Sequence, residues 1–189
     1  MRQRIFKIVV FATAIAAVAC SKNAAWRETE RRELREEVQA YRDMIYLQNL
    51  ANEEFDLFSG DVVEAIEVAY PVYTVFEELP SQSDTVQVYV VETIVTQLKD
   101  NAHNMRHLFP YHALVEAGIL PAGLNRQAQH AFYDCLARKV RNNYPSMEAF
   151  LADVMAWSGC SPTVMALQMQ CAADLFDWGV EVEETVVVE

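Results

Sequence analysis

Apolar residues recur every three or four positions along most of the chain, and this spacing limits the fold more than any other feature. Residues three and four apart lie on one face of an α-helix, so the pattern describes helices with one buried side each. Only five glycines occur in 189 residues. We therefore expect an all-α protein, an irregular bundle of five to seven helices that begins with a long helix.

Turn-forming and capping residues divide this pattern into segments. A long first helix is expected over residues 24–58, ending at Gly60, and a second begins at the capping pair Asp61 and Glu64 and breaks near Pro71. Further helices are expected over residues 84–109, 111–118, 125–143, 146–157 and 162–178. Residues 85–95 are rich in β-branched side chains that also suit a strand, and their helical spacing favours a helix.

The first 19 residues combine a cationic head with a short apolar run. Arg2, Arg4 and Lys7 precede twelve uncharged residues, 8–19. As a helix this run is about 18 Å long, whereas the hydrocarbon layer of a membrane is about 30 Å thick. Residues 1–19 therefore have the pattern of an export signal peptide.

The sequence AVAC that ends this segment, residues 17–20, resembles the lipobox of bacterial lipoproteins, although Ala17 stands where that motif usually has leucine. The resemblance implies that Cys20 is acylated, becomes the new amino terminus, and anchors the chain to the periplasmic or cell-surface face of a bacterial membrane. Two alternatives stay open: ordinary cleavage after Ala19, and retention of the segment as an anchor.

Removing the signal peptide makes the chain more acidic. The first 19 residues hold three of the 15 basic residues and none of the 27 acidic ones, which leaves a formal charge of −15. We expect a charged tether over residues 20–33, one helical domain over 34–178 and an acidic tail over 179–189. Neither nucleic acid nor nucleotide is an expected partner, because the first needs a basic face and the second a glycine-rich phosphate loop.

Three cysteines remain in the expected domain. Ser161 and Pro162 have the pattern of a helix start, which places Cys160 and Cys171 about 15 Å apart along one helix, too far for a disulfide. Any bridge must then include Cys135. We expect Cys135 to pair with Cys160, because a residue just ahead of a helix moves more easily than one inside it; three buried free thiols are the open alternative.

The segment DNAHNMRH contains the clearest group of polar side chains. If residues 84–109 form one continuous helix, Asp100, His103 and His107 share one narrow sector of it. Two imidazoles and a carboxylate at this spacing are potential ligands for zinc or a related divalent ion, and the alternative is a polar outer face. No other cofactor is expected.

Catalysis has little support in the sequence. Cys135 and His130 are five positions apart on an expected helix, where their side chains diverge by about 140° and form no nucleophile–base pair. We therefore expect a non-enzymatic interaction or assembly subunit in the cell envelope, with a protein partner on an apolar groove between helices. The alternative is an envelope metal- or pH-responsive binding protein that uses the Asp100, His103 and His107 face.

Overall fold

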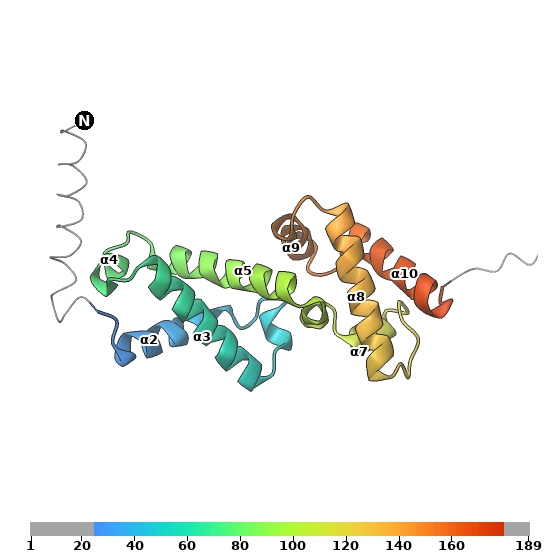
Figure 1. The fold of residues 1–189 in the computed structure, drawn as a ribbon, viewed down its shortest axis with the longest axis horizontal. Coiled ribbons are helices and arrows are strands. Elements are labelled where there is room, and N and C mark those ends of the chain that lie inside the picture. Colours follow the sequence, from blue (N-terminus) through green and yellow to red (C-terminus); the bar gives the residue numbers. More distant parts are fainter. Residues whose placement is uncertain (1–24, 180–189) are drawn as a thin grey trace, which may run out of the picture. The chain divides into compact units, whose positions relative to one another are not determined.

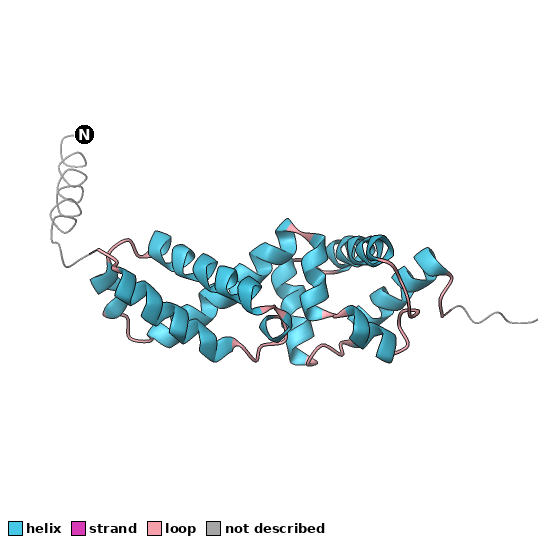
Figure 2. Ribbon diagram, turned by 90° about the horizontal axis from the view of Figure 1, so that it is seen from below, coloured by secondary structure: helices cyan, strands magenta, loops and turns pink. Residues whose placement is uncertain are grey.

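The computed structural model describes residues 25–179, and every regular element in that range is a helix (Figures 1 and 2). The all-α class is confirmed, and the nine α-helices of the described residues exceed the five to seven predicted. They are α2 (Glu28–Val38), α3 (Asn52–Ala69), α4 (Tyr73–Glu77), α5 (Gln82–Asp100), α6 (Met105–Leu108), α7 (Tyr111–Glu116), α8 (Arg126–Asn143), α9 (Met147–Ala156) and α10 (Pro162–Phe176), with short 3-10 helices at Gln39–Tyr41, Leu47–Asn49 and Ala102–Asn104. The predicted signal peptide, Cys20 and the acidic residues beyond Gly179 lie outside the described residues. Within 25–179, no helix has both the length and the apolar character needed to cross a membrane.

The described residues form two compact units, which differs from the single domain expected over 34–178. Unit 1 contains residues 25–42 and 51–93, and unit 2 contains residues 43–50 and 94–179. The helix α5 contributes to both, because unit 1 ends at Thr93 and unit 2 resumes at Ile94.

Unit 1 is built from α2, α3, α4 and the first part of α5. Its buried side chains include Phe58, Val62 and Ile66 from one face of α3. Trp26 precedes α2 and fixes the start of the unit. Its indole Nε1 donates a hydrogen bond to the Tyr70 carbonyl oxygen at 2.7 Å. This hydrogen bond satisfies the donor of a nearly buried tryptophan.

The helix α3 runs through Gly60, where the sequence predicted a stop. Glycine in a helix interior costs roughly 1 kcal/mol relative to alanine, mainly through lost chain entropy. The buried side chains on either side of Gly60 belong to one continuous apolar face, and their burial outweighs that cost. The predicted break near Pro71 is confirmed, since α3 ends at Ala69.

The long first helix predicted over 24–58 is wrong, because residues 43–50 leave the helical path and belong to unit 2. Tyr46 and Leu47 are buried there, and the Tyr46 hydroxyl donates to Gln97 Oε1 at 3.0 Å. Asn49 Nδ2 donates to the carbonyl oxygens of Ile45, at 3.0 Å, and His107, at 2.8 Å. These tertiary contacts replace the helical hydrogen bonds that the segment gives up.

Unit 2 confirms the predicted helix starts in the second half of the chain. Asn125, Ser146 and Ser161 cap α8, α9 and α10, and each side-chain oxygen accepts a hydrogen bond from the backbone N–H three residues later. Residues 85–95 are helical within α5, so the helix prediction for that ambiguous stretch is also confirmed.

Candidate functional site

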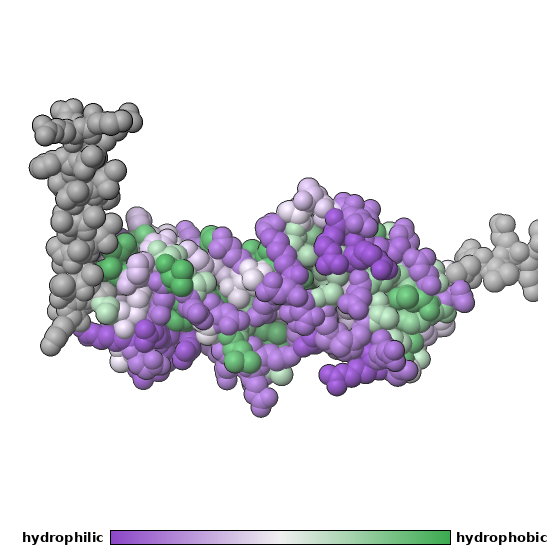
Figure 3. Space-filling view, in the orientation of Figure 1, coloured by the Kyte–Doolittle hydropathy of each residue, from purple (hydrophilic) through white to green (hydrophobic). Residues whose placement is uncertain are grey.

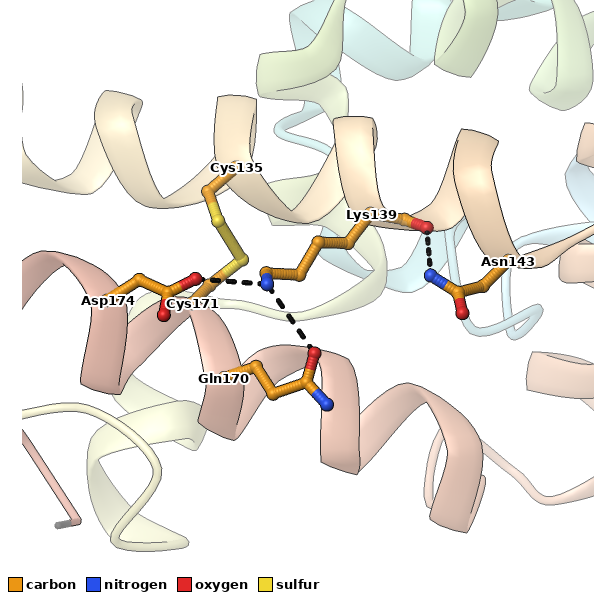
Figure 4. Close-up of a disulfide and its surroundings, with 6 residues drawn as sticks. All are labelled: Cys135, Lys139, Asn143, Gln170, Cys171 and Asp174. Carbon is orange, nitrogen blue, oxygen red and sulfur yellow. Dashed lines mark hydrogen bonds and ion pairs between the residues drawn. A yellow bond between two sulfur atoms is a disulfide. The ribbon is translucent and has the colours of Figure 1, made fainter.

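The disulfide joins Cys135 to Cys171, and the expected Cys135–Cys160 bridge is wrong. Helices α8 and α10 lie side by side, and the two alpha carbons are 5.9 Å apart (Figure 4). Both cysteines are buried at this contact. The exclusion of a Cys160–Cys171 pair was correct, but helix packing decides the partner: Cys171 faces α8, whereas Cys160 is a free, exposed thiol ahead of α10. Because Cys135 is bonded, it offers no thiol for catalysis.

Polar contacts flank this disulfide on the solvent side. Lys139 Nζ lies 3.0 Å from Asp174 Oδ2 and donates a longer hydrogen bond to Gln170 Oε1 at 3.4 Å (Figure 4). Exposed ion pairs of this kind contribute at most about 1 kcal/mol. The covalent bond and the buried apolar contacts therefore hold α8 and α10 together.

The structure does not bring Asp100, His103 and His107 onto one helical sector. The helix α5 ends at Asp100, and the side-chain oxygen of Asn101 accepts a hydrogen bond from His103 N–H at 2.9 Å to start a new 3-10 helix. His107 is buried, with its ring 5.2 Å from that of Tyr46. Residues 25–179 contain no group of three or more His, Cys, Asp or Glu side chains arranged to hold a metal ion. The asparagine cap at position 101 is the sequence signal that marks the break.

His103 instead stacks on His130 of α8. The two ring centroids are 3.7 Å apart, and the planes are inclined by 10°. The Tyr133 ring also contacts His103 in a T-shaped arrangement, with the ring centroids 5.6 Å apart. His103 Nδ1 is buried and has no hydrogen-bond partner among the described residues. No sequence pattern indicates this pair, because tertiary packing brings the two rings together across 27 positions.

Burial is the main cause that lowers the pKa of His103, and the positive charge of Arg106 is the second. His130 and Arg126 act in the same direction, while Asp134 opposes them. The folded protein therefore binds a proton at His103 less readily than the unfolded chain does.

Acid is expected to destabilise unit 2 through this histidine. Because the folded-state pKa lies below the unfolded value of about 6.5, stability is unaffected above about pH 7 and falls as the pH drops through 6.5 toward the folded pKa. We expect the unfolding free energy of His103→Gln to fall less at acidic pH than that of the wild type. Urea denaturation at a series of pH values measures this difference. His112→Gln, at an exposed histidine, is the control. Identical pH profiles for wild type and His103→Gln would contradict the assignment.

Unit 2 contains a mostly apolar groove of about 320 Å³, here named the α7–α10 groove. Its apolar walls include Ile45, Leu108, Leu114, Ile119 and Met165, and its polar lining includes His112, Cys160 and Gln168. Small-molecule and peptide sites commonly have this composition, a mostly apolar wall with a few polar groups. Figure 3 shows apolar residues gathered over the α10 end of the surface.

Gln168 is the unusual member of the groove. Its side chain is only 3% exposed and lies on the buried side of α10, yet it lines the groove. A glutamine amide carries both hydrogen-bond donors and an acceptor, so this side chain is suited to bind a polar group of a molecule in the groove.

A tight turn between α9 and α10 carries Cys160 to the groove. Ser158 and Gly159 have positive φ angles of 48° and 86°. The Gly159 N–H donates to the Val154 carbonyl at 2.8 Å, and the Ser158 N–H donates to the Met155 carbonyl at 3.2 Å. These two bonds form the Schellman motif that commonly ends a helix.

Asp153 ties the same turn to the start of α10. Its Oδ2 accepts hydrogen bonds from the hydroxyls of Ser161 and Tyr144, both at 2.5 Å. The two bonds lower the pKa of the Asp153 carboxyl, the Ser161 bond being the larger cause. Burial, reinforced by the Asp153 bond, raises the pKa of Tyr144 to about 12. The position of Cys160 is thus fixed on both sides.

Ser161→Ala is expected to lower the free energy of unfolding by about 1–2 kcal/mol, because it removes the α10 cap and one of the two hydroxyl donors to Asp153. Ser146→Ala is the matched control, since Ser146 caps α9. We expect the control to cost less, and chemical denaturation measures both. Equal losses would show that the Asp153 contact adds nothing to the cap.

Comparison of the chain with protein-family models, with curated proteins and with solved structures finds no match. The groove and its functional role are therefore argued from geometry and chemistry. Sequence analysis missed Gln168, because nothing in the helical pattern distinguishes a buried amide that faces a groove from one that is satisfied in a core.

Proposed function

We propose that this chain is an exported, lipid-anchored, non-catalytic interaction or assembly subunit of the bacterial cell envelope, and that the α7–α10 groove receives an apolar peptide segment of a partner protein. The lipobox-like residues 17–20 and the preceding apolar run support export and anchoring in the cell envelope. The acidic mature chain disfavours nucleic acid as that partner.

The observation that carries the partner proposal is the mostly apolar α7–α10 groove, which has the Gln168 side chain in its lining. A peptide group offers one donor and one acceptor, which matches the side-chain amide of glutamine. The surrounding apolar wall would contribute about 25 cal/mol for each Å² that a partner covers. Trp157 and Met165 are exposed near the site, and tryptophan and methionine are enriched in protein interfaces.

Photo-cross-linking from the groove tests this proposal. A photoreactive residue at Met165, on the groove wall, should form a discrete adduct in producing cells, and mass spectrometry should locate it on an apolar segment of one protein. Ala113→Trp fills the groove from an exposed position on α7 and should abolish the adduct. Ala152→Trp makes the same change at an exposed position outside the groove and should retain it. An adduct that survives Ala113→Trp would exclude the groove as the binding site.

Mass spectrometry of the mature amino terminus tests the anchor independently. We expect an acylated Cys20 in the membrane fraction, and Cys20→Ser should release the protein from that fraction. A mature chain that retains Met1 in the soluble cytosolic fraction would contradict export. Cleavage after Ala19 without acylation would retain export but remove the anchor.

A pH- or metal-responsive envelope protein is the second candidate, and the His103–His130 stack favours its pH-responsive form. Protonation of His103 beside the positively charged Arg106 adds a like charge to a packed site. Zinc titration followed by thermal melting tests the metal-binding form, because an ion bound only by the folded state raises the melting midpoint. An unchanged midpoint at saturating zinc would exclude it.

A further inference from the structure

Unit 2 has another cavity, of about 370 Å³, lined by residues from the end of α5, the end of α8 and the start of α9. Two cationic side chains line it, those of Lys99 and Arg141, and we name it the Lys99–Arg141 cavity. No acidic side chain is among the described residues that line it, although the chain has 27 acidic residues and 15 basic ones. A cavity with this charge attracts an anion.

The two cations differ in how far their charge is already matched. Lys99 Nζ lies 2.7 Å from Glu148 Oε1, and both side chains are about half exposed. The hydrogen bond from Lys99 is the largest cause that lowers the pKa of Glu148 to about 2, so this carboxylate is ionised at neutral pH. Arg141 forms no ion pair with a carboxylate of the described residues. Its charge is therefore the unmatched one at the cavity.

A single unmatched guanidinium favours a carboxylate among the common anions. The planar fork of N–H donors on an arginine fits both oxygens of a carboxylate. A carboxylate brings one negative charge, whereas a phosphate monoester brings about 1.5 to 2 at neutral pH. The carboxylate therefore matches the charge that Arg141 leaves unpaired.

The rest of the lining indicates what the carboxylate is attached to. Val140, Pro145 and Met147 line the cavity with apolar side chains. Tyr144 lines it too, and its hydroxyl already donates to Asp153 Oδ2 at 2.5 Å. The cavity volume lies at the lower end of the range of roughly 300–1,000 Å³ found for small-molecule sites. A short hydrocarbon chain fits both this volume and this lining.

We propose that the Lys99–Arg141 cavity binds a medium-chain carboxylate, with its carboxylate on Arg141 and its hydrocarbon chain against Val140, Pro145 and Met147. Lys99 adds a second positive charge, which Glu148 partly offsets. The site goes beyond partner binding, because it shares no lining residue with the α7–α10 groove.

Titration with octanoate tests this proposal on the full mature chain carrying Cys20→Ser, which has no acyl group of its own. NMR of the 15N-labelled protein should show saturable shifts at the backbone amides of residues 140–147. Acetate keeps the charge and lacks the chain, and 1-octanol keeps the chain and lacks the charge. We expect each to bind at least about tenfold more weakly than octanoate. Equal binding of either probe would overturn the proposal.

Four variants locate the site. Arg141→Gln should weaken octanoate binding about tenfold, because it removes a charge-assisted bond, while Arg138→Gln on the same helix should leave it unchanged. Glu148→Gln should tighten binding, because it frees Lys99 for the ligand. Ala113→Trp fills the α7–α10 groove and should have no effect.

Circular dichroism checks that each variant is folded. Equal affinity of Arg141→Gln and Arg138→Gln, or octanoate shifts that gather at the α7–α10 groove and disappear in Ala113→Trp, would overturn the proposal. No partner protein is present, so the result is independent of the cross-linking experiment.

Discussion

Reduction of the Cys135–Cys171 disulfide is expected to lower the free energy of unfolding of unit 2 by about 4 kcal/mol, the value that chain entropy gives for a loop of this length. The two cysteines are 36 positions apart. Breaking the bond releases that loop in the unfolded chain and so raises the unfolded chain's entropy. A loss of this size is large against the roughly 5–15 kcal/mol that holds a typical domain folded.

Urea denaturation with and without reductant measures this loss, with thiol labelling to confirm that the bond is open. The double variant Cys135→Ala/Cys171→Ala should show a comparable deficit and no further response to reductant. Cys160→Ala is the matched control, since Cys160 is exposed and unbonded, and it should respond to reductant as the wild type does. An unchanged unfolding free energy after complete reduction would contradict the stabilising role.

Helix identity was predictable wherever the local sequence carries its own start signal. Asn125, Ser146 and Ser161 each cap a helix within unit 2, and each bond reaches only three residues along the chain. Such signals act within one turn, so no tertiary information is needed to interpret them. The same reasoning identified the break at Pro71.

The sequence prediction is wrong where tertiary contacts, rather than local sequence, determine where a helix begins or ends. Residues 43–50 have helical spacing, but burial of Tyr46 and Leu47 in unit 2 directs them away from the preceding helix. Gly60 lies inside α3, because a continuous apolar face outweighs the cost of a glycine. In both cases the local conformational preference competes with the energy of side-chain burial, and burial determines the outcome.

The candidate site was less predictable than the fold. Elimination correctly required Cys135 in any bridge, but only the packing of α8 on α10 distinguishes Cys171 from Cys160 as its partner. The His103–His130 stack and the Gln168 amide depend on contacts between segments far apart in sequence. A helical pattern records which face is buried, and it does not record which buried polar group lacks a partner.

Phe58→Ala is expected to cost about 3–5 kcal/mol of unfolding free energy in unit 1, since it removes a fully buried ring and leaves a cavity. The Phe58 ring lies 6.3 Å from that of Phe55, so the loss also removes an aromatic contact. Leu57→Ala is the matched control. Leu57 is the neighbour of Phe58 on the same helix, and its side chain is 72% exposed, whereas Phe58 is 0% exposed. An exposed substitution of this kind should change stability by about 0.5 kcal/mol at most.

The fluorescence of Trp26 reports the unfolding of unit 1 separately from that of unit 2. It is nearly buried, whereas Trp157 and Trp178 in unit 2 are partly exposed, so its emission should shift to longer wavelength when unit 1 unfolds. In a Trp157→Phe/Trp178→Phe background, Phe58→Ala should move the urea midpoint of the Trp26 signal far below that of Leu57→Ala. Because the two positions differ by one residue along α3, helix propensity and local charge are nearly the same for both. Equal midpoints for the two variants would show that the buried face of α3 does not hold unit 1 together, and the burial pattern assigned to this helix would then be wrong.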